Sequence, residues 1–125
     1  MWGYERMKSR ANLIRLKQFQ VNEKRRQLEQ IDQMMSELQR MVNELENQIA
    51  SEEKRAGITD VTHFAYPTFA KAARNRANNL LGSIRELQIQ RDAAVRALEE
   101  AEAEYGKVTA LEQRDTPSRS ERTAL

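Results

Sequence analysis

The sequence has no cysteine, few turn-forming residues and few aromatic side chains. Its 125 residues include 4 glycines and 2 prolines, and Phe, Trp and Tyr together make up 6% of the chain. The lack of cysteine excludes a disulfide scaffold and thiolate catalysis. The scarcity of turn signals and of β-branched and aromatic residues argues against a many-stranded sheet. A compact domain of this length would also need more large apolar side chains to build one central core.

Long apolar segments are missing as well. No run approaches the roughly 20 apolar residues that span a bilayer, and no apolar segment typical of a secretory signal follows the N-terminus. What the chain does contain is Ala, Glu, Lys, Leu and Arg, which together make up half of it. This composition is typical of long helices and coiled coils. The sequence therefore predicts an all-α, cytoplasmic protein.

Apolar residues recur in two heptad runs, one on each side of a break in the middle of the chain. The 3-4 spacing within each run keeps one apolar stripe facing a partner helix. We expect the core of the coiled coil to consist of Ile14, Val21, Leu28, Ile31, Met35, Leu38, Val42, Leu45 and Ile49 in the first run, and of Leu80, Ile84, Leu87, Leu98 and Val108 in the second. Alanines at 73, 77, 94 and 101 share the second lattice and allow the helices to approach closely.

Some positions depart from these stripes. Arg91 occupies a core position of the second run. A buried charge there would fix the register at a cost in stability. Alternatively, the side chain extends its guanidinium to the edge of the seam, the contact between the two helices, and we favour this second interpretation. Near the N-terminus two core positions of the first heptad run are occupied by lysine, Lys17 and Lys24. There Leu13, Leu16 and Phe19 form a second, offset apolar face.

The break between the runs contains the strongest turn signals. Gly57 suits the position after the end of a helix, Thr59, Asp60 or Thr62 suits the cap of a short turn, and Thr68 suits the cap of the next helix. We expect helices over about 9–56 and 68–113 and a connection over 57–67. Residues 1–8 read as an N-terminal extension, and residues 114–125 read as a disordered tail.

The equal length of the two runs favours a long antiparallel two-helix coiled-coil hairpin. If Ile49 lies near Ala73, the same register puts Ile14 beside Val108, so both runs begin and end together. The competing architecture is a parallel dimer or a larger bundle of long helices.

Charge is unevenly distributed, although the net charge is only +2. Residues 1–26 carry eight Lys and Arg against two Glu, which leaves the remainder negative. Such asymmetry can indicate nucleic-acid or membrane contact, or two parts of one molecule that complement each other. The hairpin register favours the latter, because it puts the acidic residues between 99 and 104 opposite residues 18–23.

Residue patterns that support catalysis or ligand binding are scarce. The single histidine, His63, has no second histidine to share a metal with, and no segment holds the closely spaced glycines of a phosphate loop. The glutamates lie on helix faces as solvated charge. The sequence therefore indicates a protein that is not an enzyme, with no catalytic residue, no metal site and no cofactor.

An aromatic cluster in the break is the feature that a plain hairpin turn does not explain. It consists of Phe64, Tyr66 and Phe69. One interpretation is a small satellite core that packs on Ile49 and Ile58. The other is a partner-binding surface, because a two-helix protein has no third layer to cover aromatic side chains. Both hold together if Tyr66 is exposed while Phe64 and Phe69 pack.

Two segments resemble a known family. MKSRANLIRLKQFQVNEKRRQLEQID, from Met7, and AGITDVTHFAYPTFAKAARNRANNL, around the break, are similar to FliJ, the small coiled-coil protein of the flagellar type III export apparatus, and most similar to its alphaproteobacterial branch. The resemblance covers about residues 7–115. Its most specific part is HFAYPTFAKAA, because any coiled coil shares the heptads. MWGYER departs from the pattern as an extension ahead of the usual start.

The resemblance implies an antiparallel hairpin that is not an enzyme. It implies three partners, namely the export ATPase ring, the cytoplasmic domain of the membrane export gate and the export chaperones, and a cytoplasmic location at the periphery of the inner membrane. In the family the end formed by both termini is thought to enter the ATPase ring. Here that end contains Arg10, Arg15 and Lys17. For Phe64, Tyr66 and Phe69, a role in partner binding is expected only from the argument about exposed aromatic residues.

Two other functions fit the sequence. A nucleic-acid-binding hairpin could use the basic N-terminal segment, but the basic residues there lack interleaved aromatic residues and the second arm is acidic. A generic coiled-coil scaffold or dimer is the third hypothesis.

Overall fold

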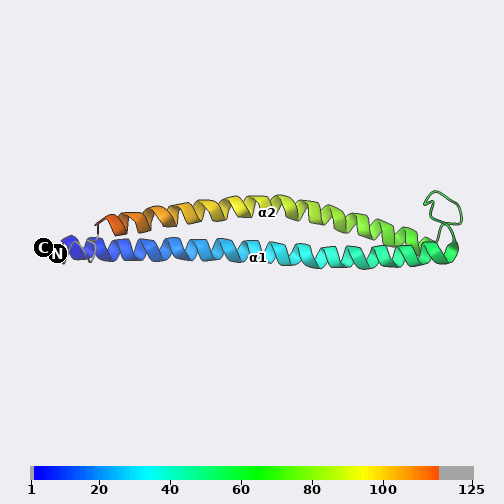
Figure 1. The fold of residues 1–125 in the computed structure, drawn as a ribbon, viewed down its shortest axis with the longest axis horizontal. Helices are drawn as coiled ribbons and strands as arrows, with labels where there is room; N and C mark the ends of the chain where they lie inside the picture. The colour runs from blue at the N-terminus through cyan, green and yellow to red at the C-terminus, as the bar shows by residue number, and fades with distance from the viewer. Residues whose placement is uncertain (1, 116–125) are drawn as a thin grey trace. The chain divides into compact units, whose positions relative to one another are not determined.

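The fold is a hairpin of two long helices. The structure is a computed structural model and describes residues 2–115, with side chains for residues 3–114. Helix α1 covers Trp2–Ala56 and helix α2 covers Thr68–Asp115. The two helices pack against each other and are joined by one short connection, and no strand is present within the described residues (Figure 1). The predicted all-α hairpin is confirmed.

The end of α1 follows the capping chemistry expected of its sequence. Gly57 has a positive φ of 72°, a conformation that glycine adopts without a steric penalty. The amides of Gly57 and Ile58 both donate to the carbonyl of Glu53, at 2.8 and 3.3 Å. These bonds satisfy a carbonyl that the helix end leaves without an intrahelical partner. Gly57 therefore acts as the glycine cap that the sequence predicts.

The start of α2 differs in one detail from the expected capping. The amide of Lys71 donates to the carbonyl of Pro67 at 3.0 Å. Since the cap residue is the one whose carbonyl accepts the first intrahelical bond, Pro67 occupies the cap position and Thr68 is the first helical residue. Proline suits this position because its missing N–H would have no intrahelical acceptor there.

The outer ends of both helices extend beyond the expected boundaries. Helix α1 begins at Trp2 rather than near residue 9, and α2 continues to Asp115 rather than 113. Adding a residue to an existing helix is much easier than starting one, and the single Gly3 costs only about 1 kcal/mol relative to alanine. The expected disorder of residues 116–125 lies outside the described residues.

The chain divides into two compact units. The terminal unit contains the described residues up to Leu28 and those from Ala93 onward, and the loop unit contains Glu29–Asp92. In the terminal unit Val21 and Ala101 are buried, and the half-buried apolar residues include Ile14, Leu28, Leu98, Tyr105 and Val108. Each of these lies on one of the two heptad lattices.

The loop unit has the larger share of the buried side chains. Val42, Ile49, Tyr66 and the alanines at 70, 73 and 77 are buried, while the half-buried residues include Ile31, Met35, Leu38, Leu45, Leu80, Ile84 and Leu87. Val42 is the one large side chain that is fully buried within the described residues. A seam between two helices thus derives its stability from many half-buried contacts rather than from one central core.

Candidate functional site

A small apolar cluster closes the connection, and we call it the tip core. It consists of buried Ile49, Tyr66, Ala70 and Ala73, with Leu45 and Ile58 packed against them. The alanines follow one another at helical spacing on the face of α2 that meets α1. Because alanine is small, Ala70 and Ala73 leave room for the ring of Tyr66 between α1 and α2.

Polar contacts fix the ring of Tyr66 in the tip core. Its hydroxyl donates to Glu53 Oε2 at 3.2 Å, and Glu53 Oε2 also accepts from Arg74 Nη2 at 3.5 Å. The interaction with Tyr66, followed by the negative charge of Glu53, raises the pKa of Arg74. The three side chains come from the connection, α1 and α2, so their contacts tie all three segments together.

Local hydrogen bonds shape the rest of the connection. Asp60 Oδ1 accepts from the amide of Thr62 at 3.0 Å and from its hydroxyl at 2.7 Å, and these bonds lower the pKa of Asp60. His63 Nδ1 accepts from the amide of Ala65 at 3.0 Å. The amides of His63 and Tyr66 close two successive turns onto the carbonyls of Asp60 and His63. Of the three predicted caps, Asp60 is the one whose side chain does the capping.

The aromatic cluster has two residues in the connection, Phe64 and Tyr66, and one in α2, Phe69, and their burial is the reverse of the expected one. Tyr66 is only 8% exposed, whereas Phe64 is 97% exposed and Phe69 57% exposed. The expectation that Tyr66 is exposed while Phe64 and Phe69 pack is therefore wrong. Tyr66 can be buried because its hydroxyl has an acceptor in Glu53. Phe69 precedes the buried Ala70, so it lies to the side of the seam.

Phe64 has one close aromatic neighbour. Its ring stacks on the imidazole of His63, with the ring centres 4.7 Å apart and the planes inclined by 23°. Both residues are exposed, and neither belongs to the tip core. Phe64 and Phe69, which we call the tip aromatics, thus present apolar surface to solvent.

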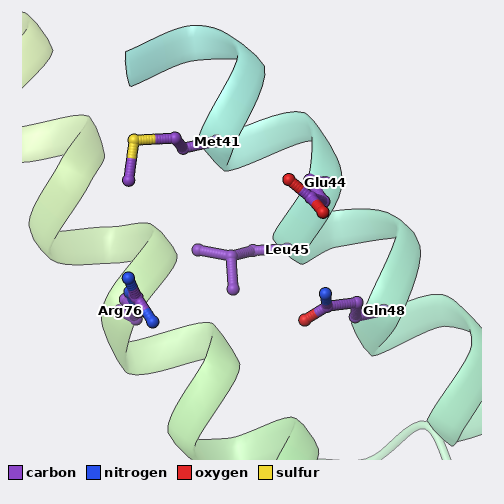
Figure 2. A pocket seen from close by; sticks show the side chains of 5 residues that line it. All are labelled: Met41, Glu44, Leu45, Gln48 and Arg76. Atoms are coloured by element: carbon purple, nitrogen blue, oxygen red, sulfur yellow. The ribbon is translucent and has the colours of Figure 1, made fainter. Parts of the chain in front are cut away.

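Two adjoining shallow hollows lie in the loop unit, and one of them is lined by Phe69. The first is lined by Phe69 and by a row of α1 residues, namely Glu44, Asn47, Gln48, Ser51 and Glu52. The second is lined by Met41, Glu44, Leu45, Gln48 and Arg76. Figure 2 shows Leu45 directed into the space between the helices, with Arg76 on the α2 side. Because the hollows share Glu44 and Gln48, one continuous surface extends from Phe69 to Met41.

The predicted basic residues belong to the terminal unit. Lys17 Nζ contacts Glu104 Oε2 at 2.8 Å, and this hydrogen bond and charge lower the pKa of Glu104. Arg15 is exposed, and Arg10 is half-buried. In the same unit Arg25 Nη2 lies 3.7 Å from Glu102 Oε2. Part of the basic charge is therefore matched by the acidic segment of α2, as the antiparallel register predicts.

The charged core position is matched within the loop unit. Arg91 Nε contacts Asp32 Oδ1 at 2.5 Å, and the Arg91 side chain is half-exposed at the edge of the seam. The hydrogen bond and the charge of Asp32 raise the pKa of Arg91. The register that pairs Ile49 with Ala73 also puts Asp32 near Arg91, so the sequence contains a signal for this ion pair. No pattern in the sequence predicts the contact between Glu53 and Arg74.

Comparisons with known proteins add no assignment. No protein-family model, curated protein or solved structure matches the chain. Within residues 2–115 no helix is long and apolar enough to cross a membrane, and the same residues contain no group of three His, Cys, Asp or Glu side chains suited to a metal ion. The candidate site is therefore defined by its surface, which consists of the tip aromatics and the two adjoining hollows.

Proposed function

We propose that this chain is a non-enzymatic component of the bacterial flagellar type III export apparatus, of the FliJ type. In this role the hairpin links the export ATPase ring with the membrane export gate and the export chaperones, in the cytoplasm at the periphery of the inner membrane. The support comes from the two segments that resemble FliJ and from the hairpin fold.

One observation carries the proposal further than the heptads do. The most specific part of the resemblance, residues 63–73, contains both tip aromatics, and both are exposed. Phe64 is not part of the tip core, so the fold gives no reason for a large apolar side chain there. Exposed aromatic residues are typical of protein interaction sites, where they supply much of the binding energy.

The proposal assigns different partners to the two units. The tip aromatics and the two adjoining hollows are the surface for the export gate or the chaperones. Arg10, Arg15 and Lys17 are the contacts to the ATPase, because the resemblance places the end with both termini there. Tyr66 is reassigned from partner contact to support of the tip core, since its ring is buried.

Binding to the purified export ATPase and gate domain tests the proposal. We expect the wild-type chain to bind both, and the double variant Phe64→Ala, Phe69→Ala to lose about tenfold or more in affinity for the gate domain or for a chaperone. Ile89→Ala is the matched control, because Ile89 is an apolar residue of α2 that is 70% exposed. Equal losses for both variants would argue against the tip surface.

A deletion strain tests the cellular role independently. We expect loss of motility, with hook and filament subunits retained inside the cell. Normal motility, together with no binding of the chain to the export ATPase or the gate domain, would overturn the proposed function.

A further inference from the structure

The terminal unit has an exposed apolar row on α1 that lies outside the seam. The row consists of Leu13, Leu16 and Phe19, which are 41, 50 and 60% exposed. The residues between them that face α2, Ile14 and Lys17, belong to the heptad lattice and are half-buried. We call the three residues the α1 ridge.

The spacing of the α1 ridge matches the way helices pack. Residues three apart form one of the two sets of ridges on a helix surface, and such a ridge fits the groove of a second helix at a shallow crossing angle. Three large apolar side chains in one such row span almost two turns of α1. No described residue of α2 buries them to the extent that it buries Val21. The row therefore has the shape to accept one more helix.

Charge around the α1 ridge selects the chemistry of that helix. Residues 3–20 contain five basic side chains and one acidic side chain, Glu5. Lys17 is matched by Glu104, but Lys8 and Arg15 form no ion pair among the described residues. Arg15 lies four residues before Phe19, and Lys8 lies seven before Arg15, so both are on one side of the ridge.

The acidic residues near the ridge do not cancel this charge. Glu23 forms an ion pair with Arg26, three residues further on. Glu100 and Glu104 line a hollow with Phe19, Glu23 and Lys24, and Arg15 is not among the residues that line it. Glu104 is already paired with Lys17. One flank of the ridge thus remains basic.

We propose that the α1 ridge binds an acidic amphipathic helix of another protein. The apolar stripe of that helix packs on Leu13, Leu16 and Phe19, and its carboxylates lie along the flank formed by Lys8 and Arg15. Recognition through the apolar face of an amphipathic helix is common. The proposal depends only on residues of the terminal unit and does not require that the chain belong to an export apparatus.

A designed peptide tests the proposal with the full chain. The probe is a helical peptide about three heptads long, with leucine at the stripe positions and glutamate on both flanks. The matched peptide carries lysine in place of every glutamate. We expect the acidic peptide to bind with a measurable Kd that weakens with salt, and NMR shifts to map it to residues 8–20. The lysine peptide should bind at least about tenfold more weakly.

Variants of the chain separate the apolar and charged contributions. Leu16→Ala with Phe19→Ala should weaken binding of the acidic peptide about tenfold or more, while Ile89→Ala should leave it unchanged. Arg15→Glu should weaken it more than Arg40→Glu, which changes the net charge equally at an exposed position of the loop unit. Because all these side chains are exposed, far-UV circular dichroism should show an unchanged fold.

Several results would overturn the proposal. The acidic peptide could fail to bind at a peptide concentration of about 1 mM, the two peptides could bind equally well, or the NMR shifts could map to another part of the chain. A second copy of the chain as the occupant would also overturn it. That outcome would appear as a dimer in analytical ultracentrifugation that Leu16→Ala with Phe19→Ala dissociates, whereas the proposal expects no change in oligomeric state.

Discussion

The hydroxyl of Tyr66 donates a hydrogen bond to Glu53 Oε2 across 3.2 Å. This bond joins the connection to the last turns of α1, while the ring beside it fills the tip core with Ile49 and two alanines. The connection is therefore held by one buried aromatic side chain with a polar anchor, and its other aromatic residue, Phe64, is left to solvent.

Removing the hydroxyl and removing the ring of Tyr66 should have different costs. Tyr66→Phe loses one hydrogen bond, worth about 1 kcal/mol. Tyr66→Ala also empties the space beside Ile49 and should cost about 3 kcal/mol. Urea unfolding followed by circular dichroism measures both. Equal costs for the two variants would show that the ring does not fill the tip core.

A substitution at the middle of the seam tests the heptad register. Leu38 is half-buried in the loop unit, so Leu38→Ala should destabilise by about 2 kcal/mol, the lower end for buried leucine. Ile89→Ala, at an exposed position of α2, should change stability by less than about 0.5 kcal/mol. A melting temperature that is unchanged by Leu38→Ala would contradict the register.

The sequence predicts which residues are buried between the two helices, because burial in a coiled coil follows one period. Residues such as Val21, Val42 and Ile49 repeat at seven, and only one face of each helix can meet the other. Gly57 was also predictable, since a helix end with positive φ strongly favours glycine. Helix ends were predicted less well, because the chain can extend a helix past Gly3 at small cost.

The sequence could not show which residues of the aromatic cluster are buried and which are exposed. Phe64, Tyr66 and Phe69 are similar in size. Burial of the first two depends on which of them the turns direct inward, and that of Phe69 depends on its position around α2. Tyr66 can be buried because its hydroxyl donates to Glu53, which also accepts from Arg74. Those two residues lie 13 and 8 positions away from Tyr66 in the sequence. No periodic pattern relates a connection to the helices beside it, so the tip core became visible only in the structure.

The ion pair between Arg91 and Asp32 should contribute little stability. Both side chains are substantially exposed, and exposed ion pairs are screened by water and salt. A double-mutant cycle with Arg91→Gln and Asp32→Asn should therefore give a small coupling at low salt that vanishes at about 1 M NaCl. A large coupling that persists in high salt would mean that the pair is desolvated inside the seam.

The contact between Lys17 and Glu104 should make stability depend on pH in the acid range. Lys17 lowers the pKa of Glu104, so folding favours the charged carboxylate. That contribution is fully present above the ordinary pKa of a glutamate and is lost as the pH falls through the lowered value in the folded protein. In Lys17→Gln the carboxyl group of Glu104 should titrate closer to its ordinary range, which NMR of the side-chain carboxyl carbon measures directly.

The same pair can be tested through unfolding at two pH values. The difference in urea midpoint between wild type and Lys17→Gln should be present at neutral pH and absent in strong acid, where Glu104 is protonated in both proteins. Glu99→Gln is the control, because Glu99 is exposed and forms no ion pair among the described residues. Its effect should show no comparable change with pH. A difference for Lys17→Gln that is equally large in strong acid would mean that Lys17 acts through the packing of its aliphatic chain against the seam, where it is half-buried, and not through its charge.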